Sequence, residues 1–96
     1  DFQAWGCLLM QIDICIEDSK FNDALDTLNY AAEFYKNHAE FLYRRAGIYY
    51  KLGEMDLSFD TFLKAYVIDN SLCYIMFELF PELAKERDFK PFYDKL

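Results

Sequence analysis

Two segments of this 96-residue chain resemble each other at an offset of 34 residues. The segment ALDTLNYA (residues 24–31) aligns with SFDTFLKA (residues 58–65), and Asp26, Thr27 and Ala31 meet identical residues. Self-similarity at a fixed period of this length is typical of proteins built from stacked helix pairs. Two helices cannot bury their apolar faces alone, so we expect neighbouring pairs to pack on each other.

Apolar residues recur at spacings of three and four along most of the chain, which is the pattern of amphipathic helices. No segment alternates with a period of two, so we expect an all-α fold. The pattern predicts helices over residues 2–16, from 22 or 23 to about 36–38, over 39–52 and over 55–68. A fifth helix begins near residue 72 and is interrupted before Pro81, with a short continuation over 82–87 and a tail helix over 88–96.

Turn chemistry fixes the expected ends of these helices. Asn22 or Asp23 is a candidate N-cap for the second helix. Gly53 supplies the left-handed conformation that commonly ends a helix. The run of residues 69–71 (Asp-Asn-Ser) predicts a turn whose polar side chains cap the next helix. Pro81 lacks a backbone donor and is expected to interrupt the fifth helix.

Residues 39–71 resemble a tetratricopeptide repeat at most of the positions by which that family is recognised. These positions are Leu42, the small pair Ala46 and Gly47, Tyr49, Gly53, Ser58, Phe62 and Ala65. Asn70 stands where the family often has proline. Residues 5–38 fit the pattern less closely: Ala24, Leu28 and Ala31 match, whereas Ile12 replaces the small residue and Ser19 the glycine.

The resemblance implies a short right-handed solenoid of antiparallel helix hairpins, with repeats over residues 5–38 and 39–72. A third repeat is not expected, because Phe80 and Pro81 fall where the small pair would be. The segment FELFPELAKERDFKPFYDKL looks like the closing element of some bacterial tetratricopeptide proteins. We therefore expect residues 73–96 to form a C-terminal cap. The absence of an initial Met favours the C-terminal part of a longer protein.

In the family that this chain resembles, the first helix of each repeat lines a concave groove. The candidate partner-binding residues are then Leu9, Asp13, Ile16, Tyr43, Arg44, Gly47, Tyr50, Tyr74 and Phe77. Tyrosine and arginine often anchor interfaces. The alternative is that these side chains only complete the packing between repeats or contact further repeats outside this segment. The family's Lys and Asn clamp for a C-terminal carboxylate is not evident, because Asp13 and Gly47 occupy two of its positions.

The charge of the chain disfavours two classes of partner. The net charge is −7, and residues 1–38 alone carry seven acidic and two basic side chains, a balance of −5. Phosphate groups repel such a surface, so neither nucleic acid nor an anionic membrane is an expected partner. No apolar run is long enough to cross a membrane, and no signal peptide is recognisable.

Catalytic and metal-binding patterns are missing from the sequence. Cys7, Cys15 and Cys73 are an odd number of thiols among apolar neighbours, which favours free cysteines in a reducing, cytoplasmic setting. His38 is the only histidine and lies in an expected turn without a spaced partner. The glycines stand apart and form no phosphate loop. We therefore expect neither an enzyme nor a cofactor or metal site.

The leading hypothesis is a non-catalytic interaction module that binds a peptide or a partner helix in the concave groove. The alternative is a structural spacer or self-association segment of a larger repeat protein. In that case Phe2, Trp5 and Leu9 could pair two chains into a homo-oligomer.

Overall fold

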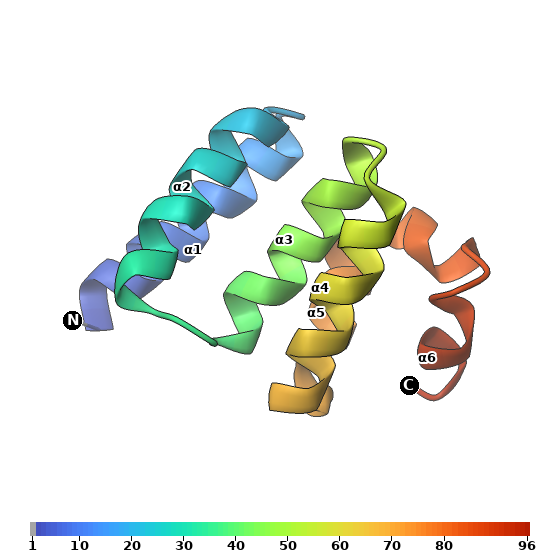
Figure 1. Ribbon diagram of the computed structural model, residues 1–96. Coiled ribbons are helices and arrows are strands. Elements are labelled where there is room, and N and C mark those ends of the chain that lie inside the picture. The colour runs from blue at the N-terminus through green and yellow to red at the C-terminus, as the bar shows by residue number, and fades with distance from the viewer. Residues whose placement is uncertain (1) are drawn as a thin grey trace.

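The computed structural model describes residues 2–96, with side chains from residue 4 onward, and this part of the chain contains helices and no strand. Figure 1 shows their arrangement. The α-helices are α1 (Phe2–Glu17), α2 (Phe21–Phe34), α3 (Ala39–Lys51), α4 (Met55–Ile68), α5 (Tyr74–Leu79) and α6 (Lys90–Asp94). Two short 3-10 helices, η1 (Asn70–Leu72) and η2 (Pro81–Lys85), flank α5. The expected all-α class is confirmed.

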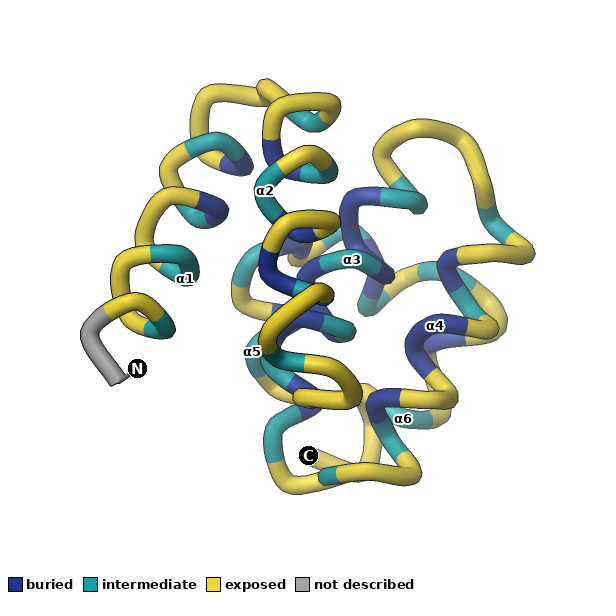
Figure 2. The backbone as a smooth tube through the Cα atoms, turned by 60° about the vertical axis from the view of Figure 1, so that its left-hand side comes forward, coloured by how far each residue is buried: buried dark blue, intermediate teal, exposed yellow. Residues whose placement is uncertain are grey.

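Helix α3 lies at the centre of the molecule. It packs against α2 on one side, α4 on another and α5 on a third, while α1 pairs with α2. Figure 1 shows α1 with α2 and α3 with α4 as two antiparallel hairpins side by side. Buried residues gather along α3 and on the sides of α1 and α4 that face it (Figure 2).

Small side chains allow the close contact between α3 and α4. Ala46, Ser58 and Ala65 are all completely buried at this contact. The Ser58 hydroxyl donates a hydrogen bond of 2.6 Å to the carbonyl oxygen of Ala46, so its polarity is satisfied inside the core. The bounds predicted for these two helices agree with the structure to within one residue.

The 34-residue offset is also visible in three dimensions. Helices α2 and α4 have 14 residues each, and they begin at Phe21 and Met55. Buried positions coincide at this offset: Ala24 with Ser58, Leu28 with Phe62 and Ala31 with Ala65. The two segments therefore use the same face for packing.

The turns before these two helices share an unusual backbone conformation. Gly53 has the predicted positive φ, at 84°, and Ser19, which aligns with it, has φ at 58°. The predicted capping of α2 by Asn22 or Asp23 is wrong, because the helix begins at Phe21 after Lys20 and both residues fall in its first turn. The predicted turn at residues 69–71 is confirmed, since the Asp69 side chain accepts from the backbone N–H of Ser71.

The C-terminal segment closes one end of the hairpin formed by α3 and α4. Phe80 is fully buried against Gly47, where an added Cβ atom would overlap its ring. Further along, Phe89 and Phe92 pack on Phe62, with ring centroids 5.2 and 4.8 Å apart. The predicted tail helix is shorter than expected: α6 spans Lys90–Asp94 only.

None of the helices formed by residues 2–96 is both long and apolar enough to cross a bilayer.

Candidate functional site

The nine residues predicted to line a groove come mainly from α1, α3 and α5, and the structure buries several of them. Tyr43 has no exposed surface, Phe77 and Arg44 retain 5% and 7%, and Ile16 retains 8%. Gly47 is also buried, whereas Leu9, Asp13 and Tyr50 are partly exposed and Tyr74 is exposed. The available surface is therefore smaller than the sequence indicates.

Tyr43 is a core residue, which corrects its assignment as an accessible groove anchor. Its hydroxyl donates a hydrogen bond of 2.7 Å to the backbone carbonyl of Asp69, just after α4 ends. Burial raises the pKa of this phenol well above its usual range. Tyr43 is covered because the chain folds back across α3 after Asp69. It holds that turn in place and is not free to touch a partner.

Gly47 is likewise closed off, and for a different reason. The Phe80 ring of the C-terminal segment occupies the space above this glycine. Phe77 is 5% exposed, and its ring centroid lies 5.3 Å from that of Tyr93. Both candidates therefore take part in the packing of the C-terminal segment, and Phe77 also borders, with Tyr74, a hollow of about 550 Å³.

Asp13 and Arg44 are brought together across the two hairpins. The Arg44 Nε donates to Asp13 Oδ1 at 2.6 Å, and Nη2 donates to Oδ2 at 3.1 Å. The remaining nitrogen, Nη1, donates to the backbone carbonyl of Glu40 at 3.0 Å. This two-pronged pairing fixes α1 relative to α3, and it uses both charged groups that the sequence assigned to a partner.

Tyr50 connects α3 to the C-terminal segment. Its hydroxyl donates a hydrogen bond of 3.0 Å to Glu86 Oε1. Burial, and then this hydrogen bond, raise the pKa of the phenol. Tyr50 stays partly exposed, so it borders the open surface while contributing to the attachment of η2.

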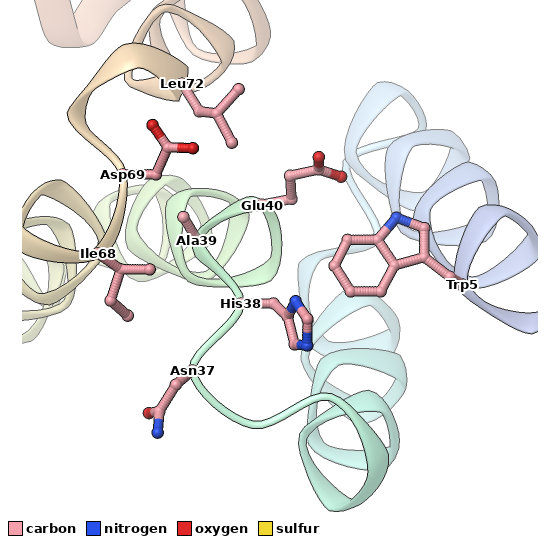
Figure 3. A pocket seen from close by; sticks show the side chains of 8 residues that line it. All are labelled: Trp5, Asn37, His38, Ala39, Glu40, Ile68, Asp69 and Leu72. Atoms are coloured by element: carbon pink, nitrogen blue, oxygen red, sulfur yellow. The ribbon is translucent and has the colours of Figure 1, made fainter. Parts of the chain in front are cut away.

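A pocket of about 280 Å³ opens where α1, the start of α3 and the turn after α4 meet (Figure 3). Its walls are Trp5 of α1, residues 37–40, and Ile68, Asp69 and Leu72. We call it the Trp5 pocket. None of these residues is among the nine groove candidates. Trp5 and Glu40 lie one helical turn before Leu9 and Arg44. Extending the predicted groove positions by four residues toward the N-terminus of each helix would have identified them.

Trp5 is held in this wall by other aromatic rings. Its ring centroid lies 4.5 Å from that of His38, 4.8 Å from Phe41 and 5.1 Å from Tyr35, all in edge-on geometry. His38 is exposed, as expected of a turn histidine, and it immediately precedes α3. Contact with Trp5 gives it a defined place in the pocket, as Figure 3 shows.

The pocket is acidic. The Glu40 carboxylate points toward Trp5, Asp69 lies at the opposite end of the pocket beside Leu72 (Figure 3), and no Lys or Arg lines the pocket. Among the described residues, ion pairs join Asp13 to Arg44, Glu82 to Lys51 and Asp94 to Lys90. Neither pocket carboxylate belongs to these pairs. Arg44 lies near Glu40 but reaches only its backbone carbonyl, so the two negative charges are not neutralised from within.

Residues 2–96 contain no group of three or more His, Cys, Asp or Glu side chains placed to hold a metal ion. No family model, no curated protein and no solved structure matches the chain.

Proposed function

We propose that the chain is part of a tetratricopeptide-like solenoid whose hairpins are α1 with α2 and α3 with α4. Support comes from the equal lengths of α2 and α4, their 34-residue offset and the buried positions they share. The left-handed turns at Ser19 and Gly53 add a further equivalent pair. Residues 73–96 then act as a cap, with Phe80 filling the space above Gly47.

We propose that the module is non-catalytic and binds a peptide or a partner helix along the inner surface of α1 and α3. The observation that carries this proposal is the Trp5 pocket, a hollow bordered by three separate elements at the open end of that surface. Partly exposed Leu9 lies one turn further along α1. At Gly47 the Phe80 ring fills the surface, so the peptide would be anchored at the Trp5 end.

Selection from a random peptide display library on the folded chain tests this proposal. Affinities of the selected peptides are then measured by polarisation of a labelled peptide, with Trp5→Ala as the test variant. Loss of this aromatic anchor should weaken binding at least about thirtyfold, since an interface hot spot contributes ~2 kcal/mol or more. Val67→Ala is the matched control, because Val67 is 86% exposed on the outer side of α4.

Circular dichroism must show that both variants remain folded. Peptides that bind Trp5→Ala as tightly as the unchanged chain would contradict the inner-surface assignment. Peptides that lose affinity only with Val67→Ala would move the site to the outer side of α4.

A second candidate function, self-association, is favoured by the outer face of α1. Of the 16 residues in this helix only Asp13 and Glu17 are charged. Met10 and Ile14, four positions apart, are 65% and 51% exposed. A helix that is apolar on all sides is usually covered on all sides. This pair replaces the residues expected from sequence, because Trp5 and Leu9 face inward and the Phe2 side chain lies outside the described residues.

Light scattering over a dilution series separates this candidate from a monomeric module. A self-associating chain should show a mass that rises with concentration, and the double variant Met10→Glu and Ile14→Glu should abolish the rise. A monomer at every concentration would remove this candidate and leave the peptide-binding proposal intact.

We propose a cytoplasmic setting. The support is chemical: all three cysteines are free thiols, and Cys73 is buried. Free thiols persist in reducing compartments.

A further inference from the structure

The walls of the Trp5 pocket combine two kinds of chemistry. Ala39, Ile68 and Leu72 are apolar, and the indole of Trp5 offers a flat aromatic surface. Glu40 and Asp69 add two carboxylates at the border, seen in Figure 3 on either side of the start of α3. A ligand that suits all of these walls has an apolar stem and a cationic end.

The charge balance around the pocket strengthens this match. Arg44, four residues after Glu40, directs its guanidinium to Asp13 and to the Glu40 carbonyl. Residues 1–38, which contribute Trp5 and one edge of the pocket, carry a balance of −5. A cation arriving from outside would therefore meet two carboxylates that form no ion pair with any side chain of the described residues.

Asp69 is fixed in position before any ligand binds. Its Oδ1 accepts hydrogen bonds from the backbone N–H of Ser71 at 3.0 Å and from the Ser71 hydroxyl at 2.5 Å. Its backbone carbonyl accepts from buried Tyr43. A carboxylate held in this way loses little conformational freedom when it binds, which favours affinity.

We propose that the Trp5 pocket receives an arginine side chain of the partner peptide, with its guanidinium at the Glu40 carboxylate and against Trp5, while Asp69 adds negative charge at the opposite end of the pocket. The inference rests on the proposed peptide-binding function and names the chemistry of its anchor. Arginine fits better than lysine, because a planar guanidinium stacks on an indole and pairs with carboxylates through several fixed donors. A flexible ammonium group offers a single point charge.

A pair of small probes tests the pocket directly. Trp5 is the only tryptophan of the chain, so its fluorescence reports on the pocket alone. The probes are N-acetyl-arginine methylamide and its citrulline counterpart, which has nearly the same shape and no charge. We expect a saturable change with the arginine probe, weakened by added salt because the pairing is ionic. The citrulline probe should produce at least about tenfold weaker binding, equivalent to about 1.4 kcal/mol.

The double variant Glu40→Gln and Asp69→Asn should abolish the response to arginine while keeping the helical circular dichroism spectrum. Equal responses to both probes, or an arginine response that salt and the double variant leave unchanged, would overturn the inference. The salt series tests the ionic pairing on the unchanged chain, even where the double variant fails to fold.

The display selection separates this inference from the function on which it rests. Selected peptides that depend on Trp5 but tolerate replacement of every arginine by citrulline would overturn the arginine assignment and leave the peptide-binding function standing. Selected peptides that contain arginine and bind Trp5→Ala unchanged would overturn both.

Discussion

At the scale of single residues, the two segments offset by 34 residues can be compared position by position. Ser19 and Gly53 are equivalent, and both hold a positive φ, yet only glycine adopts that conformation without steric cost. A left-handed conformation costs other residues roughly 1–2 kcal/mol. We expect Ser19→Gly to raise the free energy of unfolding by about 0.5–1 kcal/mol, since the added freedom of the unfolded chain offsets part of the gain. Urea denaturation measures the change.

The reverse substitution, Gly53→Ser, is the control and should lower the free energy of unfolding by a similar amount. A loss of stability in Ser19→Gly would show that the serine side chain stabilises the turn more than its backbone conformation costs.

Gly47 carries a second prediction at this scale. A Cβ atom at this position would overlap the Phe80 ring, which is itself fully buried. Gly47→Ala should therefore lower the free energy of unfolding by ~1–3 kcal/mol through overpacking. Gly6→Ala is the matched control, since Gly6 also lies in a helix and nothing lies within 4 Å of an added Cβ. Helix propensity alone predicts that Gly6→Ala is stabilising by up to ~1 kcal/mol.

Thermal denaturation of both variants distinguishes the two effects. Stabilisation by Gly47→Ala as large as that by Gly6→Ala would mean that Phe80 does not rest on α3 in solution.

At the scale of helices, the contact between α3 and α4 depends on small side chains. Ala65 is completely buried there, so Ala65→Leu should lower the free energy of unfolding by ~1–3 kcal/mol. Val67→Leu on the same helix is the control, because Val67 is 86% exposed and has room for a larger side chain. If Ala65→Leu and Val67→Leu both leave the free energy of unfolding nearly unchanged in a denaturant titration, the register of α4 on α3 is wrong.

Tyr43 links α3 to the end of α4, and its contribution should depend on pH. Tyr43→Phe removes the hydrogen bond to the Asp69 carbonyl and leaves that oxygen without its buried donor, at a cost of about 1–2 kcal/mol near neutral pH. Burial raises the pKa of the folded phenol, so the neutral form is favoured in the folded state. The stabilisation is complete below pH ~10, where unfolded tyrosine is also neutral, and it is lost as pH rises above that value.

Denaturant titrations from neutral to alkaline pH measure this dependence. The stability difference between the unchanged chain and Tyr43→Phe should shrink above pH ~10. A difference that stays constant there would mean that the Tyr43 phenol ionises as readily in the folded state as in the unfolded state.

Local patterns predicted α3 and α4 well and the site poorly, for a physical reason. The bounds of α3 and α4, the turn at Gly53 and the cap at Asp69 depend on residues close in sequence, so they are readable from it. The C-terminal segment is harder, because bulky Phe80 and Pro81 break it into short helices whose placement is set by the surface beneath them.

The Trp5 pocket and the burial of Tyr43 both depend on how distant segments meet. Trp5, Glu40 and Asp69 come from three parts of the chain, and periodicity places each on a helix face without fixing the distance between faces. Tyr43 and Tyr50 share a face of α3, yet the returning chain covers one and leaves the other partly exposed. Sequence spacing alone does not separate such a pair.

At the scale of the whole molecule, the two ends of the inner surface of α1 and α3 differ in how far the C-terminal segment covers them. The C-terminal segment fills the end near Gly47 and Tyr50, where Phe80 and Glu86 contact α3. The other end stays open at the Trp5 pocket and holds the uncompensated carboxylates. A partner is therefore expected to approach from the α1 side, and substitutions in η2 should affect stability more than binding.

The three cysteine thiols lie at different depths, so their reactivity reports on how firmly the C-terminal segment covers α3. Cys7 is exposed on α1, Cys15 is partly buried, and Cys73 is buried where the chain turns back over α3. Burial also raises the pKa of the Cys73 thiol, which reduces the reactive thiolate.

In maleimide labelling followed by mass spectrometry, Cys7 should react first and Cys73 only as denaturant unfolds the whole chain. Cys7→Ser is the control and should remove the fast reaction alone. Labelling of Cys73 well below the unfolding transition would show that the C-terminal segment detaches from α3 on its own, and the closed end of the inner surface would then be available to a partner as well.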